Sequence, residues 1–294
     1  MTGRTKERAW AKLNICLDVT GILPGGYHAL RSVMQSVSLC DDLTVSVSPG
    51  EGNIRVGTNR AYLPTGEKNL AGKAAAVFRD AAGLADVDFA IEIRKHIPVC
   101  AGMGGGSSDA AAVLRALNRL CGTGMDTKTL CKLGESIGSD VPYCVLGGTA
   151  LAEGRGEILT ALPNMPECFV VICKPKFPVS TPEMFARIDS AAELPHPDTD
   201  RLVDAVKAGD LYGAAASMGN VFETVLPKGQ REIASIKGVL RSSGAIGSVM
   251  SGSGPTVFGL FPEREGAEAA CFVLRQRYRE TYFARIPKSW DEME

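Results

Sequence analysis

The sequence predicts an α+β protein of two domains, and three observations support this prediction. The chain has 294 residues, which is longer than a typical single domain of roughly 100–200 residues. Stretches with strand and helix periodicity follow one another without the strict alternation of a doubly wound parallel sheet. The composition shifts over residues 158–168, where LTALPNMPE supplies two prolines. We therefore expect a first domain over residues 1–160 and a second over residues 161–294.

The individual elements follow from the period of the apolar residues, two for strands and about 3.6 for helices. The expected strands lie at residues 9–48 with a turn at Gly25-Gly26, then at 53–57, 87–95, 141–147 (VPYCVLG), 149–154 (TALAEG), 169–174, 245–250, 255–261 and 281–286. The expected helices lie at residues 69–82, 108–120, 127–137, 181–190, 200–208, 210–218, 228–243 and 264–279.

The overall composition excludes several classes of protein. Hydrophobic residues make up 45% of the chain and charged residues 22%, which supplies a full core and excludes wholesale disorder. The 32 basic and 33 acidic residues leave a net charge of −1, which does not favour nucleic acid or an anionic membrane as a partner. Any anion must then be bound by a local site.

The cysteines and the N-terminal segment indicate a cytoplasmic protein. The nine cysteines include no C-x-x-C pair and lie mostly in apolar runs, so reduced buried thiols are a better interpretation than zinc or disulfides. The segment MTGRTKERAWAKLN is charged and lacks the apolar run of a signal peptide. No apolar stretch approaches the ~18 residues of a membrane-spanning helix.

The most informative segment is a glycine-rich loop, PVCAGMGGGSSD (98–109), between an expected strand and an expected helix. Its four glycines allow the backbone to approach a ligand closely, and consecutive amides can form a concave anion site. A helix starting at Ser107 or Ser108 adds free N–H groups and two hydroxyls. The loop matches neither the Walker A nor the Rossmann pattern. The alternative is a simple chain reversal with a serine as the N-cap.

This loop resembles the phosphate loop of the GHMP kinases, and three other segments narrow the resemblance. These segments are AKLN (11–14) followed by GGYH (25–28), GSDVP (138–142) followed by GGTALAEGRGE (147–157), and MSGSGPT (250–256). In order and spacing they resemble the branch that acts on 4-diphosphocytidyl-2-C-methyl-D-erythritol, from about residue 9 to residue 262. Asp109 is a departure, because that family often has asparagine there.

The resemblance implies a fold and a reaction. The fold would be the two-domain GHMP kinase fold, with a ribosomal protein S5 domain 2-like N-terminal domain and a ferredoxin-like C-terminal domain. The reaction would be ATP-dependent phosphorylation of the 2-hydroxyl of 4-diphosphocytidyl-2-C-methyl-D-erythritol, in the non-mevalonate route to isoprenoids. ATP and Mg²⁺ are the expected cofactors, and the expected state is a monomer or homodimer without nucleic-acid or membrane partners.

The resemblance also implies two catalytic residues, although each has a simpler interpretation. Asp140 would accept the proton of the substrate hydroxyl or orient it. By its sequence context alone, a turn or cap residue is the favoured interpretation. Lys12 would stabilise the transferred group and keep Asp140 ionised, whereas a lysine on a strand is ordinarily solvated.

Substrate residues follow in the same way. Asn14 shares the face of Lys12 and would bind near the reacting hydroxyl. Tyr27 and Phe185 would sandwich the cytosine while His28 reads its edge. The alternatives are a structural Tyr-His pair after a turn and a core position for Phe185. Gly252 and Ser253 would close over the diphosphate, or form only a tight hairpin.

The remaining expected contacts concern ATP and the metal ion. The expected ATP-binding residues are Asn69, Lys95, Pro98, Gly102, Met103, Gly104, Gly105, Gly106, Ser107 and Ser108. Asn69 and Lys95 would lie near the adenine, partly through backbone contacts. For Mg²⁺ no certain ligand is identifiable; Ser108, with Asp140, is the candidate contact, and phosphates and water would supply the rest.

Three other functions remain open at this stage. Another GHMP kinase, acting on homoserine or mevalonate, would not need Tyr27, His28 or Phe185 for a base. A nucleotide-binding regulatory protein would keep the loop without Lys12 and Asp140. An RNA-binding protein could share the fold of the first domain, but the chain lacks a basic excess.

Overall fold

The computed structural model describes residues 1–227 and 229–288. Contacts between residues divide the chain into two compact units. The first unit comprises residues 1–11, 40–99 and 104–147, and the second comprises residues 12–39, 100–103 and 148–294. Two long strands, β1 (Gly3–Ile22) and β2 (His28–Pro49), contribute residues to both units. The linear boundary expected after residue 160 therefore differs from this division, and it stays a prediction.

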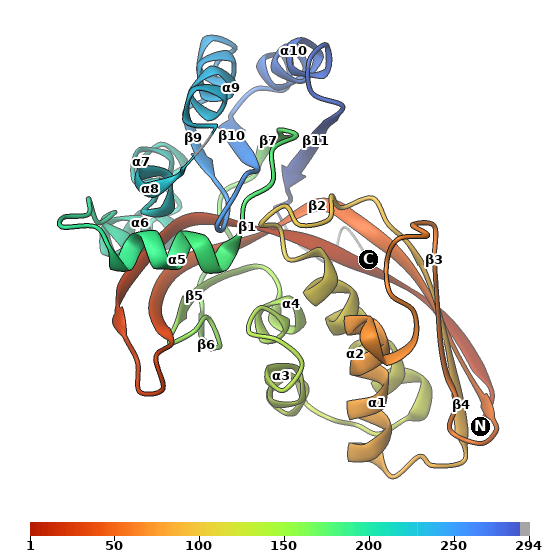
Figure 1. Ribbon diagram of the computed structural model, residues 1–294. Helices are drawn as coiled ribbons and strands as arrows, with labels where there is room; N and C mark the ends of the chain where they lie inside the picture. The colour runs from red at the N-terminus through yellow and green to blue at the C-terminus, as the bar shows by residue number, and fades with distance from the viewer. Residues whose placement is uncertain (228, 289–294) are drawn as a thin grey trace. The chain divides into compact units, whose positions relative to one another are not determined.

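In the first unit the strands are hydrogen-bonded in the order β3 (Ile54–Thr58), β4 (Val87–Arg94), β2 and β1. The helical elements are η1 (Gly66–Lys68), α1 (Leu70–Ala82), α2 (Gly105–Cys121), α3 (Thr127–Glu135) and α4 (Val141–Leu146). Helices α1 and α2 lie side by side (Figure 1). The alternating residues of β2 and β4 and the inner faces of α1 and α2 form the buried core of this unit, which includes Val45, Ile91, Phe78 and Leu114.

In the second unit one set of strands has the order β6 (Ile158–Ala161), β5 (Thr149–Glu153), β2, β1 and β8 (Gly219–Asn220). A separate antiparallel sheet has the order β11 (Glu280–Ile286), β7 (Cys168–Lys174), β10 (Val257–Phe261) and β9 (Gly247–Met250). The helices are α5 (Thr181–Asp189), α6 (Thr199–Lys207), α7 (Leu211–Ala216), α8 (Phe222–Val225), α9 (Gln230–Ser242) and α10 (Arg264–Arg275).

The separate sheet has the topology expected for the second domain. Its strands run β7, β9, β10, β11 along the chain, while helix α9 precedes β9 and helix α10 precedes β11 (Figure 1). Their spatial order places the fourth strand beside the first and the third beside the second. This is the split β-α-β-β-α-β arrangement of ferredoxin-like domains.

Several expected elements differ from the structure. Residues 141–147 were expected as a strand, but Val141–Leu146 form α4, with Pro142 in its first turn. Val141, Pro142, Tyr143, Cys144 and Val145 are all buried, so the apolar run carries no helical periodicity. Helix α10 ends at Arg275, four residues before the expected end. The short elements β6, β8 and α8 were not expected, and the expected start of the helix at 228 lies outside the described residues.

Two compositional expectations can be compared with the structure. All nine cysteines lie in the described residues and are free. Among the described residues, no helix is long and apolar enough to cross a membrane.

Candidate active site

The glycine-rich loop leads directly into helix α2. The helix begins at Gly105, with Gly104 as its N-cap at φ 65°, three residues before the expected start. A left-handed N-cap favours glycine, which explains how the helix can begin inside the glycine run. Ser107 and Ser108 therefore lie within the first turn, and neither is the N-cap. The first amides of a helix have no acceptor inside it, so this turn offers N–H groups to an anion.

Ser108 has a structural contact that its sequence context did not indicate. Its buried Oγ donates a hydrogen bond to the carbonyl of Trp10 at 2.6 Å, which ties α2 to β1. A role for Ser108 at a metal ion stays a prediction. Within the residues that the structure describes, no group of three or more His, Cys, Asp or Glu side chains is placed to hold a metal ion.

Lys95 lies at the centre of a buried charged cluster in the first unit, which also contains Asp41 and Asp109. The Lys95 Nζ donates to Asp109 Oδ2 at 2.6 Å and to Asp41 Oδ2, and Lys95 is only 5% exposed. Asp41 Oδ1 also accepts the backbone N–H groups of His96 and Ile97. Gly105, the first residue of α2, lies close to this ammonium, because a Cβ there would be 3.4 Å from Nζ. The charged cluster thus supports the start of α2 from within the core.

The environment of this cluster shifts the pKa values of Lys95 and Asp109. Burial lowers the pKa of Lys95, but Asp109 and Asp41 outweigh burial and raise it overall. Burial raises the pKa of Asp109 to about 8, although Lys95 pulls it down and Asp41 adds to the increase. Asp109 Oδ1 has no hydrogen-bond partner among the residues that the structure describes. A protonated Asp109 would leave the cluster neutral, since two carboxylates around one ammonium otherwise carry a net negative charge.

The two residues expected near adenine use their side chains locally. Asn69 is the N-cap of α1: its Oδ1 accepts from Ala71 N at 3.0 Å and its Nδ2 donates to Pro64 O at 3.0 Å. The side chain of Lys95 is held in the charged cluster. An ATP contact through either residue therefore stays a prediction, and backbone groups are the available atoms.

In the second unit, Lys12 and Asn14 form a buried polar network on β1. Lys12 is 5% exposed, so the expectation of an ordinary solvated lysine is wrong. Its Nζ donates to Asn14 Oδ1 at 2.9 Å, and Asn14 Nδ2 donates to Ser32 Oγ at 2.8 Å. Ser32 Oγ in turn donates to Cys16 O at 2.6 Å. This network fixes the side chains of both residues on the face that their sequence spacing predicted.

The second glycine loop (251–254) lies against the first. The Lys12 amide donates to Met103 O at 3.1 Å, and Ser251 Oγ donates to Gly102 O at 2.9 Å. A Cβ on Gly102 would be 2.3 Å from the carbonyl oxygen of Ser251, and a Cβ on Gly252 would be 3.1 Å from Gly102 Cα. The two backbones touch at a distance that only glycine permits. The second loop is thus more than a tight hairpin.

Asp140 precedes α4 in the first unit. Its backbone occupies the N-cap position, but its carboxylate makes no capping hydrogen bond. Its backbone therefore agrees with the turn or cap interpretation of the sequence, although its side chain does not contribute to the cap. The role of Asp140 as the proton acceptor stays a prediction.

The segment expected to bind the base lies in the second unit, opposite helix α5. Tyr27 is 58% exposed, and the Arg155 guanidinium lies 5.3 Å from its ring centre. The His28 ring stacks on Phe185 with centroids 4.2 Å apart, and its Nε2 lies 2.8 Å from Asp189 Oδ1. Phe185 also meets Phe222 edge-on at 5.1 Å, so it is both a core contact and a partner of His28. A cytosine between Tyr27 and Phe185 stays a prediction.

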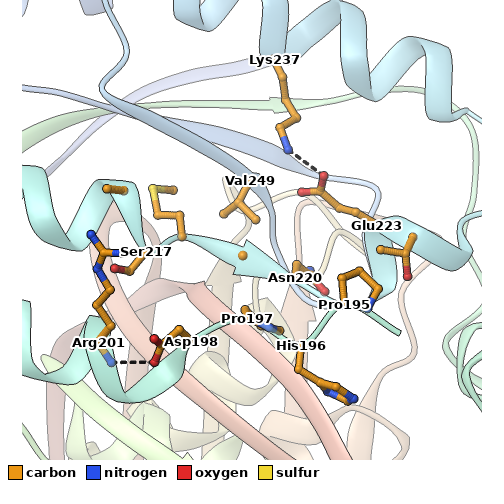
Figure 2. Close-up of a pocket in the computed structure, with 14 residues that line it drawn as sticks. Pro195, His196, Pro197, Asp198, Arg201, Ser217, Asn220, Glu223, Lys237 and Val249 are labelled. Carbon is orange, nitrogen blue, oxygen red and sulfur yellow. Dashed lines mark hydrogen bonds and ion pairs between the residues drawn. The ribbon is translucent and has the colours of Figure 1, made fainter. Parts of the chain in front are cut away.

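A pocket of about 360 Å³ lies behind the second glycine loop (Figure 2). Asn220 lines the pocket, and its Nδ2 donates to the carbonyls of Met250 and Gly252. Glu223, also in the lining, accepts from Met250 N and forms an ion pair with Lys237 at 2.7 Å (Figure 2). The pocket lining thus supports the loop from outside, and none of the residues singled out from the sequence lines it.

Several residues with a place in this arrangement were not singled out from the sequence. They are Asp41, Ser32, Ser251, Asn220, Asp189 and Thr181, whose Oγ1 lies 2.7 Å from Ser253 Oγ. Only Ser251 lies in a segment that the motifs had marked. The others act through contacts between distant parts of the chain, which no local pattern records.

Comparisons with known proteins show the family and the fold of this chain. The model of the GHMP kinases N terminal domain matches residues 69–148, and that of the GHMP kinases C terminal domain matches residues 202–280. A solved homoserine kinase from Cytophaga hutchinsonii, 20% identical, superposes with a TM-score of 0.72 over 96% of this chain and 94% of its own, which shows the shared fold. This chain belongs to the GHMP kinases.

More similar relatives define the branch. The 4-diphosphocytidyl-2-C-methyl-D-erythritol kinase of Lachnoclostridium phytofermentans is 44% identical over 91% of both chains. That of Lachnospira eligens is 45% identical over 92% of this chain and 93% of its own. A crystal structure of 4-(cytidine 5'-diphospho)-2C-methyl-D-erythritol kinase, 32% identical, has a TM-score of 0.79 and covers 96% of this chain and 98% of that one. Within the GHMP kinases, the chain belongs to the 4-diphosphocytidyl-2-C-methyl-D-erythritol kinase family.

Proposed function

We propose that this chain transfers the γ-phosphoryl group of ATP to the 2-hydroxyl of 4-diphosphocytidyl-2-C-methyl-D-erythritol, in the non-mevalonate route to isoprenoid precursors. The observation that carries the proposal is the identity of 44–45% with kinases of that name over 91–92% of the chain. The buried Lys12–Asn14 network and the two touching glycine loops support it, because they provide fixed polar groups of the kind that phosphoryl transfer requires.

ATP would place its phosphates on the first turn of α2. The amides of the glycine loop supply donors without a change of conformation, and the helix dipole favours negative charge. Mg²⁺ prefers oxygen ligands, retains several waters and shields the phosphate charge when bound. Asp140 supplies a carboxylate of the right type, whereas the Ser108 hydroxyl hydrogen is used in the bond to Trp10.

The chemical step would require little covalent participation by the protein. The substrate 2-oxygen forms a bond to the γ-phosphorus, the bond from that phosphorus to the β–γ bridging oxygen breaks, and ADP leaves with the electron pair. Asp140 would take the hydroxyl proton. Lys12 would stabilise negative charge on the transferring group from a fixed, buried position.

The cytidine diphosphate end of the substrate would be held in the second unit. Tyr27 would offer an aromatic face, Phe185 would offer ring surface beside its stack on His28, and His28 would offer ring nitrogens for the base edge. Gly252 and Ser253 would face the diphosphate with backbone amides and a hydroxyl. Asn14 would lie near the reacting hydroxyl.

Replacing Asp140 tests the assignment of the proton acceptor. Asp140→Asn keeps the shape but removes the base, so we expect kcat to fall by orders of magnitude, while the Kd of ATP measured by calorimetry without Mg²⁺ changes little. Asp126→Asn is a matched control, because Asp126 caps α3 in the same unit and asparagine also caps helices. A near-normal kcat in folded Asp140→Asn would remove Asp140 from the mechanism.

A further inference from the structure

Helix α5 carries three side chains on one face that meet the substrate-binding segments of the second unit. Thr181, Phe185 and Asp189 are spaced four residues apart, so they lie on one side of the helix. Thr181 Oγ1 is 2.7 Å from Ser253 Oγ, and Phe185 stacks on His28. Asp189 ends the helix and lies 2.8 Å from His28 Nε2.

The position of Asp189 is not one that favours helix stability. A carboxylate in the last turn faces the negative end of the helix dipole, where cations are preferred. The same helix also has an exposed i,i+4 ion pair between Glu183 and Arg187, which contributes little. The contact with His28 accounts for a carboxylate at this position, which the energetics of the helix alone do not explain.

We propose that Asp189 is a positioning residue that fixes the tautomer of His28 and thereby makes the site select cytosine over uracil. The selectivity part rests on the proposed function, in which His28 reads the edge of the base. A carboxylate only accepts hydrogen bonds, so His28 Nε2 must carry the hydrogen. When the imidazole is neutral, its lone pair is then on Nδ1.

Two contacts prevent the ring from presenting its other edge. The stack on Phe185 holds the plane of the imidazole, with 20° between the two rings. The contact with Asp189 holds Nε2, and the His28 side chain is only 15% exposed, whereas that of Asp189 is 46% exposed. The ring is thus held in one orientation and one tautomer.

An acceptor at Nδ1 distinguishes the two pyrimidines. Cytosine presents an amino donor at position 4, whereas uracil presents a carbonyl acceptor there. The 4-amino group of cytosine can donate a hydrogen bond to Nδ1. The 4-carbonyl oxygen of uracil has no hydrogen to donate, so its lone pair would face the lone pair of Nδ1. A site built to make a hydrogen bond rejects an analogue that leaves its polar group unpaired.

The test measures kcat/KM for 4-diphosphocytidyl-2-C-methyl-D-erythritol and for its uridine analogue. In Asp189→Asn the amide can donate or accept, so both tautomers of His28 are allowed. We expect the cytidine-to-uridine preference to fall about 5- to 150-fold, as expected for a contact worth ~1–3 kcal/mol. The KM for ATP and the kcat with the cytidine substrate should change little. Asp189→Glu retains the acceptor and should recover most of the preference, and Glu183→Gln on the same helix should behave as wild type.

A second readout needs no turnover. Ring-nitrogen NMR shifts of the three histidines report which nitrogen carries the hydrogen. We expect a single Nε2–H tautomer for His28 in the wild type and a mixture in Asp189→Asn. A mixture in the wild type, or an unchanged preference in Asp189→Asn, would overturn the inference. If the wild type phosphorylates neither substrate, the proposed function fails, while the NMR result still decides the role of Asp189.

Discussion

The regions that would hold the phosphates of ATP and the cytosine of the substrate are built in different ways. The phosphate region uses backbone amides at the start of α2, above the buried cluster of Asp41, Lys95 and Asp109. The base region uses the side chains of Tyr27 and His28, and Tyr27 is largely exposed. Phosphate binding at this place would therefore depend on the same contacts that hold the fold. Base selection by Tyr27 would instead be able to change with little change in stability.

The largest effect on folding is expected at the contact between the two glycine loops. A methyl group on Gly102 would overlap the Ser251 carbonyl at 2.3 Å and would occupy a backbone with φ 72°. We expect Gly102→Ala to lower the free energy of unfolding by about 2–5 kcal/mol. The KM for ATP should rise as well. Denaturant unfolding and steady-state kinetics measure the two effects.

Comparing Gly122→Ala with Gly102→Ala separates the cost of the left-handed backbone conformation from the cost of steric overlap. Gly122 ends α2 at φ 61°, but a Cβ there meets nothing within 4 Å. We expect a loss of only about 1–2 kcal/mol and an unchanged KM for ATP. Equal losses in the two variants would mean that the loop contact does not contribute.

An intermediate, pH-dependent effect is expected from Asp109. Burial raises its pKa to about 8, above the ordinary value near 3.8, so the folded protein binds a proton that the unfolded chain releases. This contribution to stability is complete below about pH 4 and is lost as the pH rises toward 8. The Asp109→Asn variant has no ionisable side chain at this position, so its stability lacks this pH-dependent contribution.

Urea unfolding of the wild type and Asp109→Asn between pH 5 and 9 would measure this contribution. The wild-type free energy of unfolding should fall relative to the variant by up to ~1.4 kcal/mol per pH unit below pH 8 and then level off. Parallel profiles would show that Asp109 is already ionised at pH 5.

The smallest effect on folding is expected at Tyr27. Because its ring is 58% exposed, Tyr27→Ala should leave the free energy of unfolding nearly unchanged. Loss of a stack worth ~1–3 kcal/mol should raise the KM for the cytidylyl substrate roughly 5- to 150-fold. The KM for ATP should stay the same. An increase in the KM for ATP instead would mean that the two nucleotides are placed the wrong way round.

Sequence reasoning succeeded where chemistry is contained in a short segment. The two-residue spacing of Lys12 and Asn14 predicted that both lie on one face of a strand, and their hydrogen bond confirms this. The nest of amides expected from Gly102 to Ser108 stays a prediction. The start of α2 was placed too late because glycine is normally read as a helix breaker, although Gly104 caps this helix.

Contacts between distant residues could not be predicted. Asp41, Lys95 and Asp109 come from β2, the end of β4 and α2, and each alone is an ordinary charged residue. Asp189 resembles a solvated residue at a helix end until the fold brings His28 to it. Only the tertiary structure shows that Asp41 and Asp109 pair with a buried lysine and that Asp189 contacts a histidine ring.

The most direct test of the central proposal is turnover on a panel of acceptors with ATP, namely 4-diphosphocytidyl-2-C-methyl-D-erythritol, homoserine and mevalonate. ADP release and mass spectrometry of the product would be measured together. We predict ADP formation only with the cytidylyl substrate, with one phosphate added at its 2-hydroxyl. Comparable turnover of homoserine or mevalonate, or no turnover of the cytidylyl substrate by the folded protein, would contradict the account.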